Sequence, residues 1–494
     1  MLEKGNKRTI TGWVFYDWAN SVYPLIISSA IFPILFETQT SQKNAAGHTI
    51  YDTVSFLGRE FHNTEFYAYV ICLSYIVVAL ISPLLSGIAD AGGKRKLFMQ
   101  FFCYLGAFSS ALLYFFHADQ QIENTPFVIG WSIVPLFFGS IGFWGSLVYY
   151  NAYLPDIAEP KDHDKVSARG FSMGYLGSST LLIIVLILTV FTKVISIKWA
   201  FPLVSLWWIS FAIFSFSRLP KTTATQTNKK NLISSGYKEV FHVWKQIRQN
   251  KTLKGYLSAF FMFNMAVQTI MVMAVAFANK EVIGIKQTDL ILSILIIQFI
   301  GILGAYVMSK ISRITGNFKA LGIAIVIWIF LCLYVYQFVW HPWQFYIAAA
   351  FVGLVMGGIQ SLSRSTYSKL LPETKDLTSY FSFYDLAEKI GLAAPAAVRL
   401  AARGGQRGRT GNVPCVQLRH RHGGHRGCGG RRSCGGIAVR CRRDRVSHRP
   451  HRALRRRRTR VLHGQLRDQV VAHRHAQRLQ VQRGGEAARR RRTG

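Results

Sequence analysis

The stretch FYDWANS, residues 15–21, places a carboxylate, an indole and an amide directly before the first long apolar run of the chain, which extends from Tyr23 to Phe36. An ionisable side chain inside or beside a membrane span costs about 2.5 to 3.5 kcal/mol on insertion scales, so it is retained where it serves a solute pathway or a buried pair. This stretch therefore indicates a membrane protein that transports a solute.

The rest of the chain has the composition of an all-helical integral membrane protein. Half of the 494 residues are hydrophobic and 14% are aromatic. An eleventh apolar window begins near Ser379. The first window is too long and too polar for a cleaved secretory signal, so we expect it to be a permanent span. The first ten windows have about 20 residues each, the length that crosses hydrocarbon as a helix, and lie near 12–36, 66–88, 97–116, 127–150, 171–192, 200–217, 255–279, 288–309, 320–339 and 344–370.

The basic residues alternate along the connecting segments in the way that sets membrane orientation, since short loops rich in Lys and Arg remain cytoplasmic. The intervening loops carry few basic residues, so we expect a cytoplasmic amino terminus. The segments that we place inside carry Lys4, Lys7 and Arg8, then 94–96, 161–169, 218–254 and 310–319, and finally Lys369 with Lys375.

The chain repeats itself with a period of about 217 residues, because NAYLPD at 151–156 closes the fourth window and SKLLPE at 368–373 closes the tenth. Many secondary transporters are built from two similar halves around a central site. A chance match of a Leu-Pro-acid triplet is the alternative. The repeat predicts a first six-helix half over 1–217, a cytoplasmic linker over 218–254 and a second half over 255–391.

A tight charged turn, SGIADAGGKRK at residues 86–96, joins the second and third windows. Glycines allow the positive φ angles that reverse a chain quickly, and the basic triplet holds the turn on the cytoplasmic side. Asp90, near the end of a helix, could bind the amino terminus of a neighbouring helix or an Arg side chain. A plain charged turn is the alternative.

The same turn resembles the signature loop of the major facilitator superfamily, Gly-x-x-x-Asp-x-x-Gly-Arg-Lys. Asp90, Gly93, Lys94 and Arg95 are in register, and Ser86 stands in place of the first glycine. The resemblance implies two six-helix pseudo-repeats that rock in an alternating-access cycle. It also implies that these residues gate the cycle and do not bind the substrate.

Residues 16–21, 151–156 and QSLSRS at 360–365 resemble one branch of that superfamily, the autophagy-related vacuolar amino-acid effluxers and their bacterial relatives. The similarity covers about residues 10–391. It implies a secondary active transporter of small polar solutes, with amino-acid efflux as the first expectation. A bacterial-type relative implies the plasma membrane, and a vacuolar membrane is the alternative.

Polar groups that helical spacing could turn toward the interior between the halves are the candidates for the substrate pathway. Asp17 and Arg364 lie near the expected cytoplasmic ends of helices in opposite halves, where they could receive the ammonium and the carboxylate of an amino acid. The full set is Asp17, Asn20, Asn151, Asn264, Gln268, Gln298, Gln360, Arg364 and Asp385.

Several of these candidates have a structural alternative. Asp17 could accept backbone N–H bonds at a helix end, and Arg364 could extend to the cytoplasmic headgroups. Gln268 and Gln298 could simply bond across helices, as amides in membrane bundles do. Asp17 is also a candidate for carrying a coupling proton.

The composition changes abruptly after Gly391. From Leu392 to the end there are 28 Arg against three acidic residues, and no Lys, Phe, Tyr, Trp or Met. Pro395 and Arg399 stand where an apolar span should continue, which is typical of a shifted reading frame or a chimeric end. We therefore expect about 10 to 11 of twelve spans, a truncated second half, and a cytoplasmic, disordered Arg-rich tail over 392–494.

The alternative function is a membrane protein that does not transport and whose basic tail binds nucleic acid or anionic lipid. The transporter interpretation, which we favour, expects a small-molecule substrate, the lipid bilayer and no nucleic acid as partners. The sequence contains no phosphate-binding loop, metalloprotease helix or nucleophile elbow, so an enzyme is not expected. Its tail cysteines lack paired spacing, so neither a metal nor another cofactor is expected.

Overall fold

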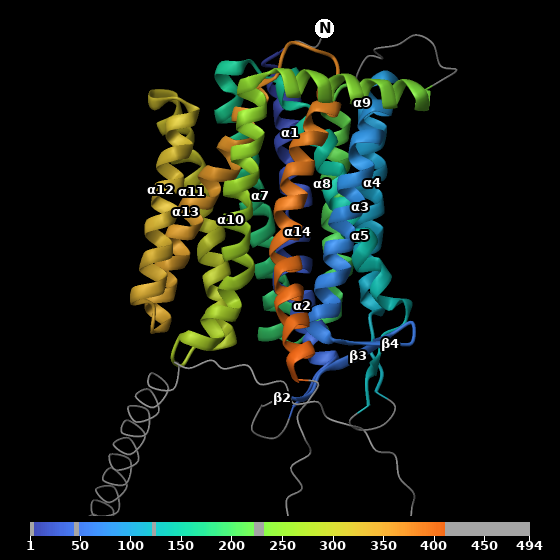
Figure 1. Cartoon of the computed structure of the whole chain (residues 1–494), viewed down its shortest axis with the longest axis vertical. Coiled ribbons are helices and arrows are strands. Elements are labelled where there is room, and N and C mark those ends of the chain that lie inside the picture. The colour runs from blue at the N-terminus through green and yellow to red at the C-terminus, as the bar shows by residue number, and fades with distance from the viewer. Residues whose placement is uncertain (1–3, 44–48, 121–124, 222–231, 411–494) are drawn as a thin grey trace, which may run out of the picture. The chain divides into compact units, whose positions relative to one another are not determined.

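The chain is almost entirely helical over the residues that the computed structural model describes, which are 4–43, 49–120, 125–221 and 232–410 (Figure 1). The first half contains α1 (Lys7–Asn20), α2 (Ile31–Gln39), α3 (Asn63–Ala91), α4 (Arg95–Leu112), α5 (Val134–Asn151), α6 (Leu154–Ile157), α7 (His163–Leu186) and α8 (Ala200–Arg218). The second half contains α10 (Lys251–Glu281), α11 (Gln287–Thr315), α12 (Asn317–Phe338), α13 (Pro342–Leu370) and α14 (Leu377–Thr410). Every long apolar window is a helix, which confirms the all-α prediction.

The helices begin and end at residues that suit those positions. The Oδ1 atom of Asn6 accepts the N–H groups of the second and third residues of α1, at 2.9 and 3.3 Å, and Asn250 does the same at the start of α10. Such side chains satisfy N–H groups that have no partner inside the helix. Gly316, with a φ of +86°, separates α11 from α12 in a conformation that other residues rarely adopt.

Apolar side chains cover outer faces of the helices. On α3, Leu73, Ile76 and Leu80 recur every three or four residues and are exposed, Leu80 by 72%. Apolar side chains such as these suit contact with the hydrocarbon of a bilayer. The helix satisfies its own backbone hydrogen bonds, as a segment inside hydrocarbon must. Within the described ranges, nine helical segments are long and apolar enough to cross a membrane. The nine do not include α10 or α14, each of which contains side chains outside the described set.

The buried apolar residues divide into two clusters that follow the two halves. One cluster joins residues from α1 to α8, and the other joins residues from α9 to α14 together with Ala152. Residues at the start of α11, such as Ile291, pack against the first cluster. The two-half architecture predicted from the repeat is therefore present.

Small residues let helices of each half approach closely. A Cβ atom added to Gly142 of α5 would lie 2.4 Å from the Cα atom of Gly106 on α4. One added to Gly357 of α13 would lie 2.2 Å from the carbonyl oxygen of Gly301 on α11. Helix contacts in lipid depend on such surfaces because no hydrophobic driving force acts there.

The segment that the sequence predicted as a polar linker contains a helix, α9 (Leu232–Gln249), so that prediction was incomplete. Val240, Val243 and Ile247 repeat at helical spacing and pack in the second cluster. In Figure 1, α9 lies across one end of the bundle, which we call the α9 end. Gly236 meets Gly87 of α3 there, since a Cβ on Gly87 would lie 2.5 Å from the Gly236 carbonyl oxygen.

Short strands, which the sequence did not predict, lie in the connections at the other end (Figure 1). The strand β1 (Gln42–Lys43) pairs with β2 (Thr49–Tyr51) in antiparallel orientation. The strand β3 (Thr53–Phe56) pairs antiparallel with β4 (Arg59–His62) and parallel with β5 (Phe127–Val128).

The last described helix also corrects a boundary. We expected the structure to change after Gly391, but α14 continues to Thr410 through Pro395. The remainder of the predicted Arg-rich tail lies outside the described residues.

Candidate functional site

Asp17 of α1 and Arg364 of α13 form a buried ion pair between the two halves. The Oδ2 atom of Asp17 accepts from both Nη atoms of Arg364, at 3.3 and 3.2 Å, and from the hydroxyl of Tyr150 on α5 at 2.7 Å. Asp17 is 5% exposed and Arg364 is 3% exposed. The two residues that the sequence nominated from opposite halves therefore meet.

Further groups of the first half complete the surroundings of Arg364. Its Nε atom donates to the hydroxyl of Ser167 at 3.0 Å, and its Nη2 atom donates to the Ser167 carbonyl at 3.0 Å. Its Nη1 atom donates to Asn151 Oδ1 at 3.3 Å. The guanidinium carbon lies 4.7 Å from the centre of the Trp13 ring and 4.2 Å from that of Phe171. Aromatic faces attract a cation at such distances.

A glycine makes room for the ion pair. A Cβ atom added to Gly170 of α7 would lie 2.5 Å from Asp17 Oδ2 and 2.9 Å from Arg364 Nη2. Both distances are shorter than nonbonded contacts allow, so the pair forms in this geometry because residue 170 has no side chain.

The geometry decides between the alternatives stated for the two charged residues. Arg364 does not extend to the headgroups, because its guanidinium is buried and paired. The carboxylate of Asp17 is bound by side chains of α5 and α13, so it does more than accept backbone N–H groups at a helix end.

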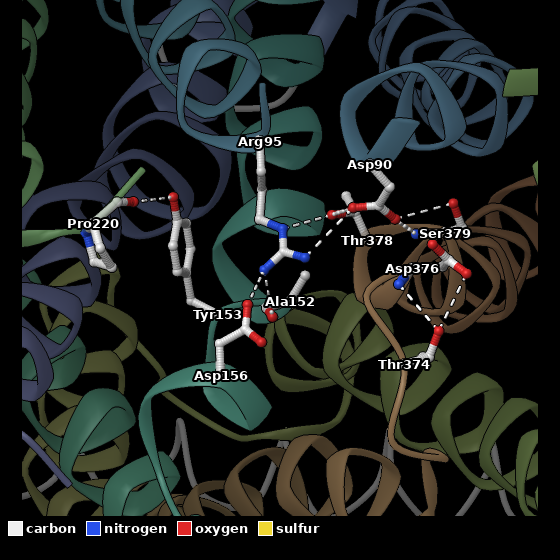
Figure 2. Close-up of polar contacts among 10 residues, drawn as sticks. All are labelled: Asp90, Arg95, Ala152, Tyr153, Asp156, Pro220, Thr374, Asp376, Thr378 and Ser379. Atoms are coloured by element: carbon white, nitrogen blue, oxygen red, sulfur yellow. Dashed lines mark hydrogen bonds and ion pairs between the residues drawn. The ribbon is translucent and has the colours of Figure 1, made fainter. Parts of the chain in front are cut away.

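A second cluster, drawn in Figure 2, joins the signature-like turn to the start of α14. Asp90 accepts from the Thr378 hydroxyl at 2.5 Å and from the backbone N–H of Ser379 at 2.8 Å. Arg95 lies between the halves, 2.5 Å from Asp156 and 2.7 Å from the Thr378 hydroxyl. Because Asp90 also lies 3.4 Å from Arg95, it makes both of the contacts considered from the sequence.

The other two residues of the turn shape its backbone. Gly93 has a φ of +61°, a conformation that favours glycine. The N–H of Lys94 donates to the Ala89 carbonyl at 2.8 Å, which closes the turn, while the Lys94 side chain is exposed. Gly93 and Lys94 therefore position Asp90 and Arg95.

A third polar cluster joins the start of α7 to the second half. Asp164 of α7 lies 2.6 Å from Lys369 of α13, and it accepts from Asn317 of α12 at 2.7 Å and from Ser312 of α11 at 2.9 Å. One buried carboxylate of the first half thus contacts three helices of the second. Asp164 was not predicted as a site residue, because nothing in the local sequence distinguishes it from a charge in a solvated loop.

Glu239 of α9 brings a further carboxyl to the second cluster. Burial, and then the neighbouring Asp376 carboxyl, raises the pKa of Glu239 to about 8, and the charge of Asp90 acts in the same direction. One oxygen of Asp376 is buried and has no hydrogen-bond partner among the described residues. A protonated Glu239 can donate to that carboxyl, whereas two carboxylates repel each other.

The remaining pathway candidates lie apart from these clusters. Gln360 accepts from the Tyr175 hydroxyl at 2.5 Å, another contact between halves. Asp385 pairs with Lys389 on α14 at 2.7 Å. Within the described part, Asn20 Nδ2, Asn264 Nδ2 and Gln298 Oε1 are buried without hydrogen-bond partners, and Gln268 is half-buried on α10.

Several residues of the three clusters were missed from the sequence. Tyr150 directly precedes Asn151 in a quoted motif, so its position was a usable signal. Trp13 stacks on Tyr150 with ring centroids 4.5 Å apart, although 137 residues separate them. No cluster of three or more potential metal ligands occurs among the described residues.

Comparisons with known proteins agree with this architecture. The family model described as "Vacuole effluxer Atg22 like" matches residues 5–401. An uncharacterised MFS-type transporter of Bacillus subtilis, YxiO, is 29% identical over 415 residues, covering 82% of this chain and 90% of its own. Autophagy-related protein 22-1 of Penicillium rubens is 22% identical over 506 residues, covering 78% of this chain and 83% of its own.

A solved structure has the same fold. The human organic anion transporter MFSD10 superposes with a TM-score of 0.55 at 13% identity, covering 81% of this chain and 95% of that one. At this identity the likeness concerns the fold alone.

Proposed function

This chain belongs to the vacuole effluxer Atg22-like family of major facilitator superfamily transporters, and we propose that it exports amino acids by secondary active transport. The observation that supports this substrate class most directly is the buried pair of Asp17 and Arg364. A zwitterion carries the two charges that this pair presents. Its ammonium could replace Arg364 beside Asp17, and its carboxylate could bind the guanidinium bidentately.

Energetics favour a functional role for the pair. A buried ion pair is commonly no more stabilising than well-packed apolar residues, whereas removing one partner costs about 3 to 5 kcal/mol. The halves can therefore part at Arg364 when another ion replaces its partner. An amino acid that binds between the halves would supply that replacement, which is how binding would drive the rocking motion.

The distribution of basic residues predicts the orientation of the chain in the membrane. Basic residues concentrate at the α9 end, where Arg95 and Lys369 lie, and we place that end and the amino terminus in the cytoplasm. For a relative of bacterial type the membrane would be the plasma membrane. Labelling a single cysteine at Lys161, whose side chain is 77% exposed, from one side of sealed vesicles tests this orientation.

Transport in proteoliposomes tests the substrate class. Efflux of a radiolabelled mixture of protein amino acids should fall at least about tenfold in Asp17→Asn and in Arg364→Gln, a loss of about 1.4 kcal/mol or more. The double variant Asp17→Asn/Arg364→Gln should regain much of the stability without regaining transport, because no buried charge is left unpaired. Lys161→Gln serves as the control.

Two results would contradict the proposal. One is efflux by the stable double variant at the rate of the unsubstituted chain. The other is the absence of amino-acid movement in the unsubstituted chain while a different solute moves.

A further inference from the structure

A buried charged cluster that the ion pair above does not involve lies on α14. Lys389 is fully buried, and its Nζ atom lies 2.7 Å from Asp385 Oδ1 and 3.1 Å from Glu388 Oε2. These three residues precede Gly391 and are all described. We call them the α14 triad.

The α14 triad faces the first half of the molecule. Lys389 Nζ lies 3.8 Å from the centre of the Trp144 ring on α5. The Ser82 hydroxyl of α3 lies beside Asp385. Tyr149 of α5 and Tyr75 of α3 are the titratable groups that feel the charges of Asp385 and Glu388 from these helices. The side-chain amide of Asn264 on α10 lies beside Gly391, two residues after Lys389 on α14.

The charges of the triad do not balance. Two carboxylates, buried Asp385 and half-buried Glu388, surround one fully buried ammonium, which leaves one net negative charge in a helix of the bundle. A net buried charge is costly because water no longer solvates it. One oxygen of the cluster is also unused, since Asp385 is 3% exposed and its Oδ2 atom has no hydrogen-bond partner among the described residues.

We propose that the α14 triad is a proton-binding site that couples transport to a proton gradient, with Asp385 Oδ2 as the atom that takes the proton. The proposal rests on the proposed function as a secondary transporter. A proton from water on one side forms an O–H bond with Oδ2 and changes the charge of the triad from −1 to zero. The same bond breaks when the proton leaves to water on the other side.

The position of the triad explains how its charge could control the halves. A neutral triad fits the closed interface with Trp144 and Ser82. A charged triad gains from contact with water, which reaches it when the halves part. Asp17 is the weaker candidate for a coupling proton because its Oδ2 atom already accepts from Arg364 and Tyr150.

Infrared difference spectroscopy of the full-length Glu239→Gln variant in lipid bilayers tests proton binding without any substrate. This substitution removes the other buried carboxyl that titrates in the same pH range, and the substitutions below are made in that background. Between about pH 5 and 8, above the titration of exposed carboxyl groups, a protonated-carboxyl band should appear on acidification. The band should be absent in Asp385→Asn, shifted in Asp385→Glu and unchanged in Asp119→Asn, a carboxyl in an exposed loop. A band that survives in Asp385→Asn overturns the proposal. A band whose titration responds to Na⁺ but not to pH also overturns it, since the site then binds a metal cation.

Transport measurements test coupling. The ratio of proton-gradient-driven accumulation to equilibrium exchange of the amino-acid mixture should fall about tenfold in Asp385→Asn, within the usual range of coupling factors. An unchanged ratio overturns the coupling. If no amino acid moves while the band still depends on Asp385, the proposed function fails and the proton site stands.

Discussion

A single guanidinium, that of Arg364, contacts residues of α1, α5 and α7 and thereby joins the two halves. Its partner Asp17 lies 347 positions away in the sequence, so the contact exists only when the whole bundle has formed. The chemistry of the two residues was sufficient to nominate both as candidates for the substrate pathway, but not to predict that they pair with each other. The supporting residues Ser167 and Gly170 were not predicted, because their roles depend on how α7 packs against α13.

Replacing Gly170 with Ala should separate the ion pair. The added Cβ would lie 2.5 Å from Asp17 Oδ2, so the carboxylate or the helix must move. We expect a loss of about 1 to 3 kcal/mol in the free energy of unfolding, as for other overpacked sites. The measurement is thermal unfolding of the purified protein.

Gly322 of α12 provides the matched control. No atom lies within 4 Å of a Cβ added there, so Gly322→Ala should leave stability unchanged or raise it by about 0.5 to 1 kcal/mol. Equal effects of the two substitutions would show that residue 170 does not constrain the pair.

Glu239 predicts a dependence of stability on pH. Its carboxyl keeps a proton up to about pH 8 in the folded protein, because burial and Asp376 raise its pKa, but releases it near 4.5 when unfolded. Between these values the folded state binds more protons, so stability should fall as the pH rises from about 4.5 to about 8. Thermal unfolding across this range should show a smaller decrease in Glu239→Gln than in the unsubstituted chain.

The exposed carboxyl of Glu373 supplies a comparison in the loop before α14. Glu373→Gln should retain the decrease. If Glu239→Gln also retains the full decrease in stability, the proton on Glu239 does not cause it.

At the scale of elements, the first turn of α14 is where the signature-like turn acts. Asp90 binds the Ser379 N–H and the Thr378 hydroxyl, and therefore stabilises the start of that helix as an acidic group does at a helix amino terminus. The charge is supplied by α3 of the other half. The start of α14 thus depends on the closure of the α9 end.

Replacing Asp90 with Asn should loosen this turn. A hydrogen bond to a charged group contributes about 1.5 to 3 kcal/mol, and the amide replaces only part of it. Hydrogen exchange at the backbone amides of residues 379–381 should become faster, while exchange in the middle of α12 should not change. Unaltered exchange at residues 379–381 would contradict the role of Asp90.

The elements differed in how far the sequence could predict them. Long apolar windows identified the helices because crossing hydrocarbon requires about 20 apolar residues, a signal that few other structures share. The short amphipathic helix α9 lacks that signal, although Val240, Val243 and Ile247 are spaced as a helix face. The strands β1 to β5 have two to four residues each, too few for a repeating pattern.

At the scale of the whole molecule, three polar clusters hold the halves together at the α9 end. Each is centred on a buried carboxylate of the first half, namely Asp17, Asp90 or Asp164, and each binds a residue of the second half. Because a buried charge requires a partner, these clusters favour a closed α9 end. An alternating-access cycle must break all three.

The distance between the halves at the α9 end shows whether the three carboxylates hold the halves together. Spin labels at Lys161 and Lys375, both exposed and in opposite halves, report that distance in lipid bilayers. The unsubstituted chain should give one short distance, and Asp17→Asn/Asp90→Asn/Asp164→Asn should add a longer population as the halves part. A single short distance in both proteins would contradict the claim that these carboxylates hold a gate.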